Sequence, residues 1–483
     1  MTKVSLGRRL TDIATADPDR AAVILVRMDG RDEQLSYREL DRRSNRAARI
    51  LAARGVTSDS RVTLALSNTL HYFIATFAIW KLGACVFPMR FDLPEWERSR
   101  LIDAARPTHV IGAFETVDLP QVRPEELDDA GFDDGLLPDI TPNPYKVNAT
   151  GGSTGVSKIV VPKAPGVVDV QGATADNPAG VMADEIRFVA GPLYHYGPSL
   201  NAITALNAGA TEVILEKFDP ALFLRSVQQY RIGSGMLVPT MLYRVLEFAD
   251  RDNYDVGSLR QLMIAGAKCA DWVFEKATTV FGPERVWVGY GGTENIGRTG
   301  ASGAEWLAHP GTTGRPVDTD LVIRSEEGDT LPVGEIGEVW MRPHWGVETD
   351  YANAELRMTA DGFATYGDLG WVDADGYLYI ADRRKDLIVS GGANIYPAEV
   401  EAALLEHPDI EDVAVVGIPS IEWGATVHAV IVPAGESEPV FAELKEFCRE
   451  KLAPYKIPKT FATTAALPRD ELGKLRRSAL VEA

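Results

Sequence analysis

A run of nine residues from Thr150 to Lys158 concentrates the groups that bind a polyphosphate. It reads T-G-G-S-T-G-V-S-K. Glycine lets backbone N–H groups turn toward an oxyanion, hydroxyl side chains add donors, and the lysine adds a positive charge. Because no G-K-[ST] follows at the Walker A spacing, the run predicts a phosphate loop of another kind, with a flexible linker as the alternative. The glycines are Gly151, Gly152 and Gly155, and the hydroxyl donors are Thr150, Ser153 and Thr154.

A second glycine-rich segment reads Tyr290-Gly291-Gly292-Thr293-Glu294 and follows an apolar run. Loops that follow parallel strands are where ligands bind in α/β sheets. In such a loop Thr293 would hold a phosphate, Glu294 a magnesium ion, and Tyr290 would lie against a base. The segment opens no helix with G-x-G-x-x-G, so it is not interpreted as a dinucleotide fingerprint.

Alternating strands and helices would position both loops. Apolar runs of four to six residues alternate with segments of helical periodicity, which predicts a parallel sheet with helices on both faces. We expect strands at residues 61–66, 84–88, 108–111, 212–215, 235–238, 261–265 and 285–289, and helices at residues 35–55, 70–82, 95–105, 220–230, 239–248 and 271–281.

The pattern changes after residue 314. Short strands are expected at 321–325, 337–341, 371–373 and 377–380, and a small α+β unit follows the charged run 382–386. In that unit we expect helices at 397–405 and 441–451 and strands at 410–417 and 426–432. The predicted fold is α/β: a large N-terminal domain (1–382) with mixed or parallel sheets and a β-rich subdomain, a hinge (383–387), and a small mobile α+β domain (388–483).

Composition excludes several classes of partner. Lysine plus arginine is 49 and aspartate plus glutamate is 69, which gives a net charge of −20. A surface this acidic repels nucleic acid and anionic lipid. The most apolar stretch, 71–89, contains His71 and Lys81, so a buried helix and strand are expected there and not a membrane span.

The cysteines are too far apart for a disulfide framework or a zinc site. They are Cys85, Cys269 and Cys448. A reducing, cytoplasmic setting fits this usage best, because oxidising compartments favour paired cysteines. The N-terminus also lacks the apolar core of a signal peptide. Each cysteine is expected to be a small buried residue and not a nucleophile.

The chain resembles the AMP-forming adenylate synthetases, a superfamily that includes acyl-CoA synthetases, adenylation domains of peptide synthetases and luciferases. The first loop is similar to their [ST]-S-G-[ST]-T-G-x-P-K-G signature, and residues 290–294 match Y-G-x-T-E. Further similar segments follow in family order over nearly the whole chain: 192–195 (P-L-Y-H), 265–267, 367–368 (G-D), 383–399, 454–459, and 467–474.

The resemblance implies ATP, Mg²⁺ and coenzyme A as cofactors and assigns roles to matching residues. Lys474, His195, Thr293 and Glu294 would act in catalysis, and Glu294 and Thr154 would hold the metal. Asp368 and Arg383 would bind the ribose. The remaining nucleotide- and CoA-binding residues would be Thr150, Gly151, Gly152, Ser153, Thr154, Gly155, Lys158, Gly266, Ala267, Lys268, Tyr290, Gly291, Gly391 and Gly392.

The resemblance also implies a two-step mechanism with a moving lid. Lys474 would reach the α-phosphate and the carboxylate during adenylation. The small domain would then rotate about Lys385, withdraw Lys474 and bring Gly391 and Gly392 to the tunnel for the thiol. Each residue also has an ordinary alternative: His195 as a core histidine, Asp368 as a turn residue, and Lys474 as a solvated lysine.

The sequence departs from the family pattern at several positions. Gly151 replaces serine, Ser157 proline, Ile159 glycine, Tyr366 threonine and Asp382 glycine. An added glycine and a missing proline predict a more mobile phosphate loop and an altered ATP affinity, with activity retained.

The acid is expected to be apolar, and aryl or bulky. Gly266, Gly291 and Gly292 suggest a roomy pocket floor, and Tyr194, Tyr196, Met236 and Trp287 suggest apolar or aromatic walls. The predicted function is an acid–CoA ligase that forms an acyl-AMP and releases pyrophosphate. The alternatives are an amide synthetase that uses an amine, an enzyme that loads a free carrier protein, and a non-catalytic nucleotide-binding protein. The sequence leaves monomer and dimer both open.

Overall fold

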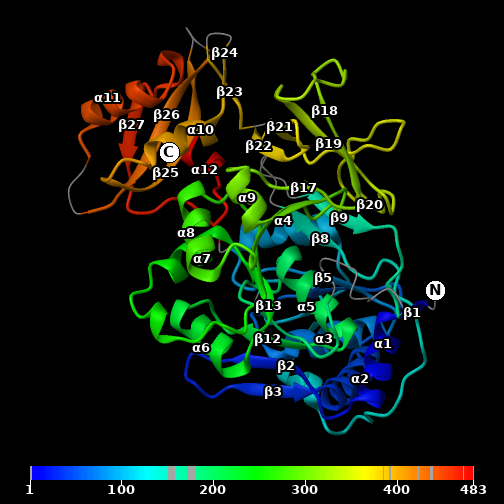
Figure 1. Ribbon diagram of the computed structural model, residues 1–483. Coiled ribbons are helices and arrows are strands. Elements are labelled where there is room, and N and C mark those ends of the chain that lie inside the picture. Colours follow the sequence, from blue (N-terminus) through cyan, green and yellow to red (C-terminus); the bar gives the residue numbers. More distant parts are fainter. Residues whose placement is uncertain are drawn as a thin grey trace.

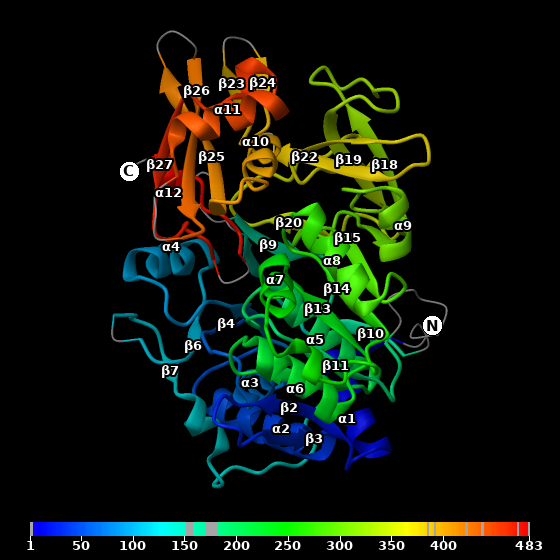
Figure 2. The same ribbon diagram turned by 60° about the vertical axis from the view of Figure 1, so that its left-hand side comes forward.

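The computed structural model describes residues 3–114, 116–150, 158–170, 181–383, 386–390, 393–420, 424–435, 439–470 and 473–481. Figure 1 shows a large body, coloured blue to yellow, and a smaller unit, coloured orange and red, built from the C-terminal segment. Figure 2 shows the same small unit above α4 and α7 of the large body. The chain therefore folds as the large α/β part and small α+β part that the sequence predicts.

A nine-stranded sheet forms the centre of the large body. Its order is β17-β16-β15-β14-β13-β11-β12-β2-β3. Neighbours from β2 to β15 are parallel, and the edge strands β3, β16 and β17 are antiparallel. The strands are β2 (Ala21–Val26), β3 (Glu33–Ser36), β11 (Ile186–Val189), β12 (Thr211–Leu215), β13 (Ser234–Leu237), β14 (Gln261–Ile264), β15 (Val286–Tyr290), β16 (Thr299–Ser302) and β17 (Arg315–Pro316).

Helices connect these strands along the chain, and capping residues and prolines mark where the helices begin. Asp219 caps α6 by accepting a hydrogen bond from the backbone of Leu222 at 3.0 Å, and Pro220 occupies the first turn, where no N–H is needed. Pro239 begins α7 in the same way. The helices are α5 (Tyr196–Ala208), α6 (Pro220–Tyr230), α7 (Pro239–Leu246), α8 (Asp271–Phe281) and α9 (Gly303–Ala308).

A smaller parallel sheet, in the order β5-β4-β6-β7, packs beside the first. Ser36 and Glu39 form a capping box that begins α2, as the sequence predicts. The apolar stretch is the predicted buried helix and strand, and Lys81 at its end donates to Asp41 at 2.7 Å. The elements are α1 (Leu6–Ala16), α2 (Tyr37–Ala53), α3 (Leu70–Lys81), α4 (Glu95–Ala105), β4 (Arg61–Leu64), β5 (Cys85–Pro88), β6 (His109–Ile111), β7 (Gln121–Val122) and a 3-10 turn, Pro124–Asp128.

The β-rich part contains three short sheets. The order β18-β19-β21-β22 forms one, β20-β9-β8 the second, and β1-β10 the third. The strands are β1 (Lys3–Ser5), β8 (Asn148–Thr150), β9 (Lys158–Pro162), β10 (Val167–Asp169), β18 (Thr319–Arg324), β19 (Gly337–Pro343), β20 (Thr349–Tyr351), β21 (Asp368–Val372) and β22 (Leu378–Arg383).

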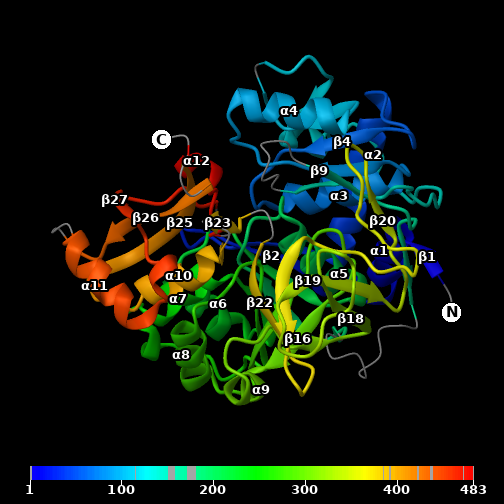
Figure 3. The ribbon, with the colours of Figure 1, turned by 90° about the horizontal axis from the view of Figure 1, so that it is seen from above.

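The small unit has its own sheet and its own core. Strands run in the order β24-β23-β26-β25, with β27 paired to β26. Ile388, Val400, Val413 and Leu444 are among the residues of its core. Seen from above in Figure 3, it lies to one side of β4 and α4. Its elements are β23 (Ile388–Ser390), β24 (Ala393–Ile395), α10 (Pro397–Leu404), β25 (Ile410–Ser420), β26 (Gly424–Pro433), α11 (Phe441–Lys451), β27 (Thr460–Thr463), α12 (Ser478–Val481) and a 3-10 turn, Pro454–Lys456.

Two further expectations concern helices and thiols. Among the residues that the structure describes, no helix combines the length and the apolar character needed to cross a bilayer. Cys85 and Cys448 are buried, and Cys269 is partly buried. Burial raises the pKa of all three thiols, to about 11, about 12 and about 11 for Cys85, Cys269 and Cys448. They therefore stay protonated at neutral pH, as expected for packing residues.

Glu212 on β12 is a fully buried acid. Both of its carboxylate oxygens lack a hydrogen-bond partner among the described residues. Burial raises its pKa to about 8, opposed by Arg187 and supported by Glu185. A carboxyl whose folded-state pKa lies above the unfolded value stabilises the fold at low pH. That stabilisation is lost as pH rises through about 8.

We therefore expect Glu212→Gln to stabilise the protein at alkaline pH. The amide cannot ionise, so the gain over the wild type should grow from about pH 6 to about pH 9 and reach on the order of 1–3 kcal/mol. Thermal unfolding midpoints at both pH values measure it. Glu247→Gln, which removes a surface charge paired with Lys276, is the control. An equal effect of Glu212→Gln at both pH values would contradict the assignment.

Candidate active site

The carboxyl ends of β13, β14 and β15 lie side by side, because these three strands are adjacent and parallel. The segments that follow them, 238–240, 265–268 and 290–294, therefore meet at one edge of the central sheet. Gly266 has a φ of +94°, where an L side chain is strained, so glycine is required for this turn. The sequence predicted these loops, and parallel pairing brings them together.

Tyr290 and Asp368 join this edge to the β-rich part. The Tyr290 hydroxyl donates to Oδ2 of Asp368 at 2.6 Å, and Asp368 is only 5% exposed. Asp368 is also the register partner of Arg383 across β21 and β22. Tyr290 and Asp368 thus come from two sheets and meet in one place, with the backbone of residue 383 opposite Asp368.

Glu294 is held by residues that sequence reasoning missed. The Tyr351 hydroxyl donates to Oε1 of Glu294 at 2.5 Å, and the Thr349 hydroxyl donates to its backbone carbonyl. Tyr351 lies on β20, which pairs with β9, so it has no local pattern that connects it to Glu294. Only the pairing of distant strands could have revealed it.

The ends of the predicted phosphate loop reach the same place. Thr150 and Lys158 are register partners across β8 and β9. Nζ of Lys158 lies 4.6 Å from the ring centre of Tyr351, a cation–π distance. Lys158, where β9 begins, thus lies beside the tyrosine that holds Glu294.

Several predicted site residues lie outside the described part of the chain. They are Gly151, Gly152, Ser153, Thr154 and Gly155 of the phosphate loop, Gly391 and Gly392 of the small unit, and Lys385 of the hinge. Gly266, Ala267, Lys268, Tyr290, Gly291, Thr293, Glu294 and Asp368 lie at or near the edge described above.

His195 precedes α5 at its N-terminal cap, and its ring lies 4.8 Å from that of Tyr194. The next residue, Tyr196, has a raised pKa because it is buried and because Tyr145 and Glu294 add negative charge nearby. One turn along, Asn201 contacts Sδ of Met236 at 3.9 Å. The N-terminal turns of α5 and the end of β13 therefore lie against each other, and the role of Tyr196 and Met236 as walls of an acid pocket stays a prediction.

A buried lysine, Lys146, was not predicted from the sequence. Its ammonium donates to the Ser199 hydroxyl and lies 5.3 Å from the ring centre of Tyr196. Burial lowers its pKa to about 7. Lys146 thus supports the start of α5 from the side of the smaller sheet.

The expectation of open space beside Gly292 is wrong. A Cβ at this position would lie 2.5 Å from Cε1 of Tyr366, so the tyrosine ring fills the volume that the glycine leaves. The physical reason is tertiary: residue 366 lies just before β21, and this strand brings its ring against the loop.

The C-terminal segment docks on the large body next to Lys474. A Cβ at Gly473 would collide with the Thr240 side chain on α7, so only a glycine permits this approach. The backbone N–H of Lys474 donates to Asp470 at 2.9 Å. Thr240 follows β13, so Lys474 is presented next to the edge where the other predicted site residues meet.

An ion pair also links the two parts. Arg476 lies 3.7 Å from Glu97 on α4. Exposed ion pairs of this kind contribute little to stability, so this pair would favour the docked position of the small unit only weakly.

The family resemblance implies an adenylation step, and we expect Glu97→Arg to slow this step by about threefold, because like charges would then face each other where the small unit docks. The double variant Glu97→Arg/Arg476→Glu should recover the wild-type rate, since the opposite charges are restored. Acid-dependent pyrophosphate release measures both. Loss that the reversed pair does not recover would contradict a role for this contact.

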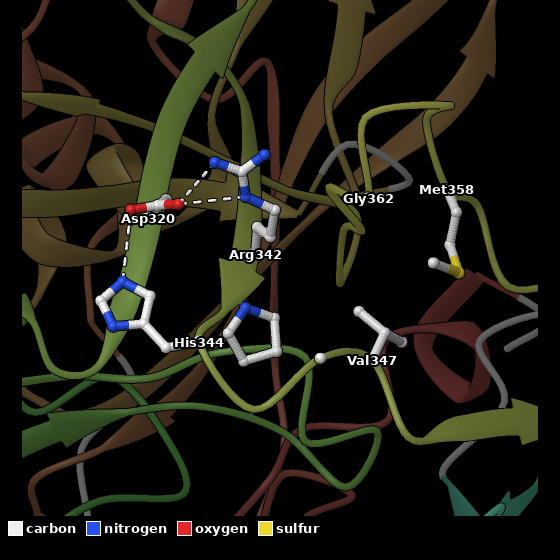
Figure 4. Close-up of a pocket in the computed structure, with 8 residues that line it drawn as sticks. Asp320, Arg342, His344, Val347, Met358 and Gly362 are labelled. Carbon is white, nitrogen blue, oxygen red and sulfur yellow. Dashed lines mark hydrogen bonds and ion pairs between the residues drawn. The ribbon is translucent and has the colours of Figure 1, made fainter.

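A separate hollow of about 420 Å³ opens between β18, β19 and the segment before β20. Figure 4 shows Asp320, Arg342 and His344 on one side and Val347, Met358 and Gly362 on the other. Asp320 accepts from Arg342 at 2.7 Å and lies 3.3 Å from His344. Its lining contains none of the predicted site residues, so it is not the candidate site.

The residues present fit a magnesium ion that arrives with a nucleotide. In the described ranges, no three His, Cys, Asp or Glu side chains form a metal-binding group. Mg²⁺ in nucleotide sites is commonly held by one or two carboxylates together with phosphate oxygens and water. Glu294, whose position Tyr351 fixes, can supply that single carboxylate.

Comparison with known proteins gives a consistent result. Residues 10–349 match the AMP-binding enzyme family, and residues 399–474 match the AMP-binding enzyme C-terminal domain. Feruloyl-CoA synthase from an Amycolatopsis species is 33% identical over 466 residues, which cover 91% of this chain and 92% of that protein.

Solved structures of similar proteins show the same architecture. The o-succinylbenzoate CoA synthetase of Bacillus subtilis, in complex with its acyl-adenylate intermediate, superimposes with a TM-score of 0.87 at 26% identity, over 100% of this chain and 99% of that one. The same enzyme with ATP and magnesium gives a TM-score of 0.83 at 25% identity, with 100% of both chains covered.

Proposed function

The chain belongs to the AMP-binding enzyme family and is an AMP-forming acid–CoA ligase that uses ATP, Mg²⁺ and coenzyme A. From this premise we propose which residues act in each of its two half-reactions. The observation that carries the assignment is the meeting of Tyr290, Asp368 and Glu294 at one sheet edge, with the Lys474 segment docked beside it.

In the first half-reaction, a carboxylate must attack the α-phosphate of ATP. Both groups are anions, so catalysis depends on positioning and on shielding of charge. Lys474 supplies an ammonium group to the meeting point. Glu294, with Thr154, would hold the magnesium ion, whose charge would neutralise the phosphates. His195 and Thr293 border the reacting groups. Three groups of residues bind the nucleotide in this proposal. Asp368 and Arg383 bind the ribose. The base is bound by Tyr290, Gly291, Gly266, Ala267 and Lys268, and the phosphates are bound by Thr150, Gly151, Gly152, Ser153, Gly155 and Lys158.

In the second half-reaction, the thiol of CoA attacks the acyl carbonyl and AMP leaves. The small domain, 388–483, would turn about the hinge 383–387, with Lys385 as its pivot. This motion breaks the contact of Gly473 with Thr240 and removes Lys474 from the site. The segment at Gly391 and Gly392 would then border the path of the thiol. Such a rotation allows one site to perform two reactions.

The acid that we propose is apolar and contains a ring. Tyr196, Met236 and the start of α5 supply an apolar wall, which suits an aryl group better than a short acid such as acetate. We also propose that the enzyme works in a reducing compartment, the cytoplasm, because its three thiols have raised pKa values and are unpaired.

A panel of carboxylic acids tests the proposal. Each acid is incubated with ATP and Mg²⁺, and pyrophosphate release is measured with and without CoA. We expect aryl acids to give the highest rates, and CoA to be consumed in proportion to AMP formed. Preference for acetate would overturn the assignment of the acid. Consumption of an added amine in place of CoA would show an amide synthetase instead.

A further inference from the structure

Tyr366 packs against Gly292 so closely that the two residues depend on each other. A Cβ on residue 292 would lie 2.5 Å from Cε1 and 2.8 Å from Cδ1 of the Tyr366 ring. Real side chains do not approach to this distance, because protein interiors are already close-packed. A side chain at 292 and the tyrosine ring at 366 therefore exclude each other.

The Tyr366 hydroxyl holds the turn that follows Glu294. It accepts a hydrogen bond from the backbone of Ile296 at 3.1 Å and donates to the carbonyl of Gly297 at 2.9 Å. Asn295 has a φ of +49° and Gly297 a φ of +142°, so the turn contains two residues in the left-handed half of φ space. Asparagine and glycine adopt such conformations more readily than other residues, so the sequence permits this turn, and the two hydrogen bonds of Tyr366 hold it in place.

The same ring contacts the residue before the loop. It lies edge-on to Tyr290, with ring centres 5.8 Å apart and planes at 88°. Tyr290 in turn donates to Asp368, two residues after Tyr366. One side chain thus contacts the loop 290–297 at its start, at Gly292 and at its end.

We propose that Tyr366 is a positioning residue that occupies the volume left by Gly292 and holds the loop that carries Glu294. It acts through the loop and not by contact with the reacting atoms. The inference rests on the proposed role of Glu294 in binding magnesium.

Reciprocal substitution tests the inference. We expect Gly292→Ala to lower the rate of acid-dependent pyrophosphate release by about tenfold in the wild-type background, because its methyl group meets the ring. In the Tyr366→Thr background the same change should cost clearly less, because the ring is gone and only the contact of the new methyl group with Oε2 of Glu294, at 3.0 Å, remains. An equal cost of Gly292→Ala in both backgrounds would overturn the proposal.

A second measurement separates positioning from packing. Tyr366→Phe keeps the ring and removes the two hydrogen bonds, so the Mg²⁺ concentration for half-maximal rate should rise about threefold or more while the KM for the acid stays unchanged. Tyr379→Phe, which removes a hydroxyl that donates to Asp373 at 3.1 Å, should leave the Mg²⁺ requirement unchanged.

The outcomes distinguish this inference from the proposed function. If wild-type protein releases no pyrophosphate with any acid, the function itself fails. If the wild type is active and Tyr366→Phe has an unchanged Mg²⁺ requirement at an unchanged unfolding midpoint, only the role of Tyr366 fails.

Discussion

Lys474→Ala is expected to lower acid-dependent pyrophosphate release by about 10²–10³-fold, the effect typical of one lost charge-stabilising group in a transition state. The proposed meeting of carboxylate and α-phosphate brings two anions together, and the alanine removes the ammonium that shields them. The structure supports the choice of this lysine, because Gly473 docks against Thr240 at the edge of the central sheet.

The second half-reaction provides the internal control for Lys474. Thioester formation from a preformed acyl-adenylate and CoA should stay within about threefold of the wild type, because the proposed rotation of the small domain would then have withdrawn this residue. Lys445→Ala, which removes another lysine of the small domain that donates to the Lys459 carbonyl at 3.0 Å, should affect neither step. Equal loss of both half-reactions would contradict the assignment of Lys474 to adenylation alone.

Glu294→Gln should lower pyrophosphate release by about 10²-fold at ordinary Mg²⁺ concentrations. The amide keeps the size of the carboxylate, and its carbonyl can still accept from Tyr351, so the loop should remain in place. It lacks the negative charge that a hard divalent cation requires.

A magnesium titration checks this prediction. The variant should need a higher Mg²⁺ concentration for half-maximal rate, and its thermal unfolding midpoint should match that of the wild type. Glu335→Gln changes an exposed glutamate elsewhere in the large body and serves as the matched control. A Glu294→Gln enzyme with wild-type activity and an unchanged Mg²⁺ requirement would remove Glu294 from the metal site.

Local signals in the sequence predicted most elements of the fold. The expected helices 35–55 and 220–230 form as α2 and α6, which begin after the capping residues Ser36 and Asp219. The alternation of strands and helices predicted the parallel interior of the central sheet. The antiparallel edge strands β3, β16 and β17 were not predicted, because they are short and have no strong apolar pattern.

The site was predictable as a set of loops but not as an arrangement of side chains. Tyr290, Glu294 and Asp368 were identified by type and motif. Tyr351 holds Glu294 from 57 residues away, and no periodicity connects the two. The glycines suggested open space, yet the ring of Tyr366 fills the volume beside Gly292.

The sequence by itself determined the chemistry that this protein carries: a hydroxyl- and glycine-rich loop, a glutamate and an aspartate at strand ends, and a lysine near the C-terminus. Backbone propensity and residue type are local properties, so short motifs can encode them. The tertiary structure alone decided that Tyr351 fixes Glu294 and that Gly473 fits against Thr240. It also decided that the ring of Tyr366 occupies the volume beside Gly292. These contacts depend on shape complementarity between segments far apart in the chain, which only the packed fold establishes.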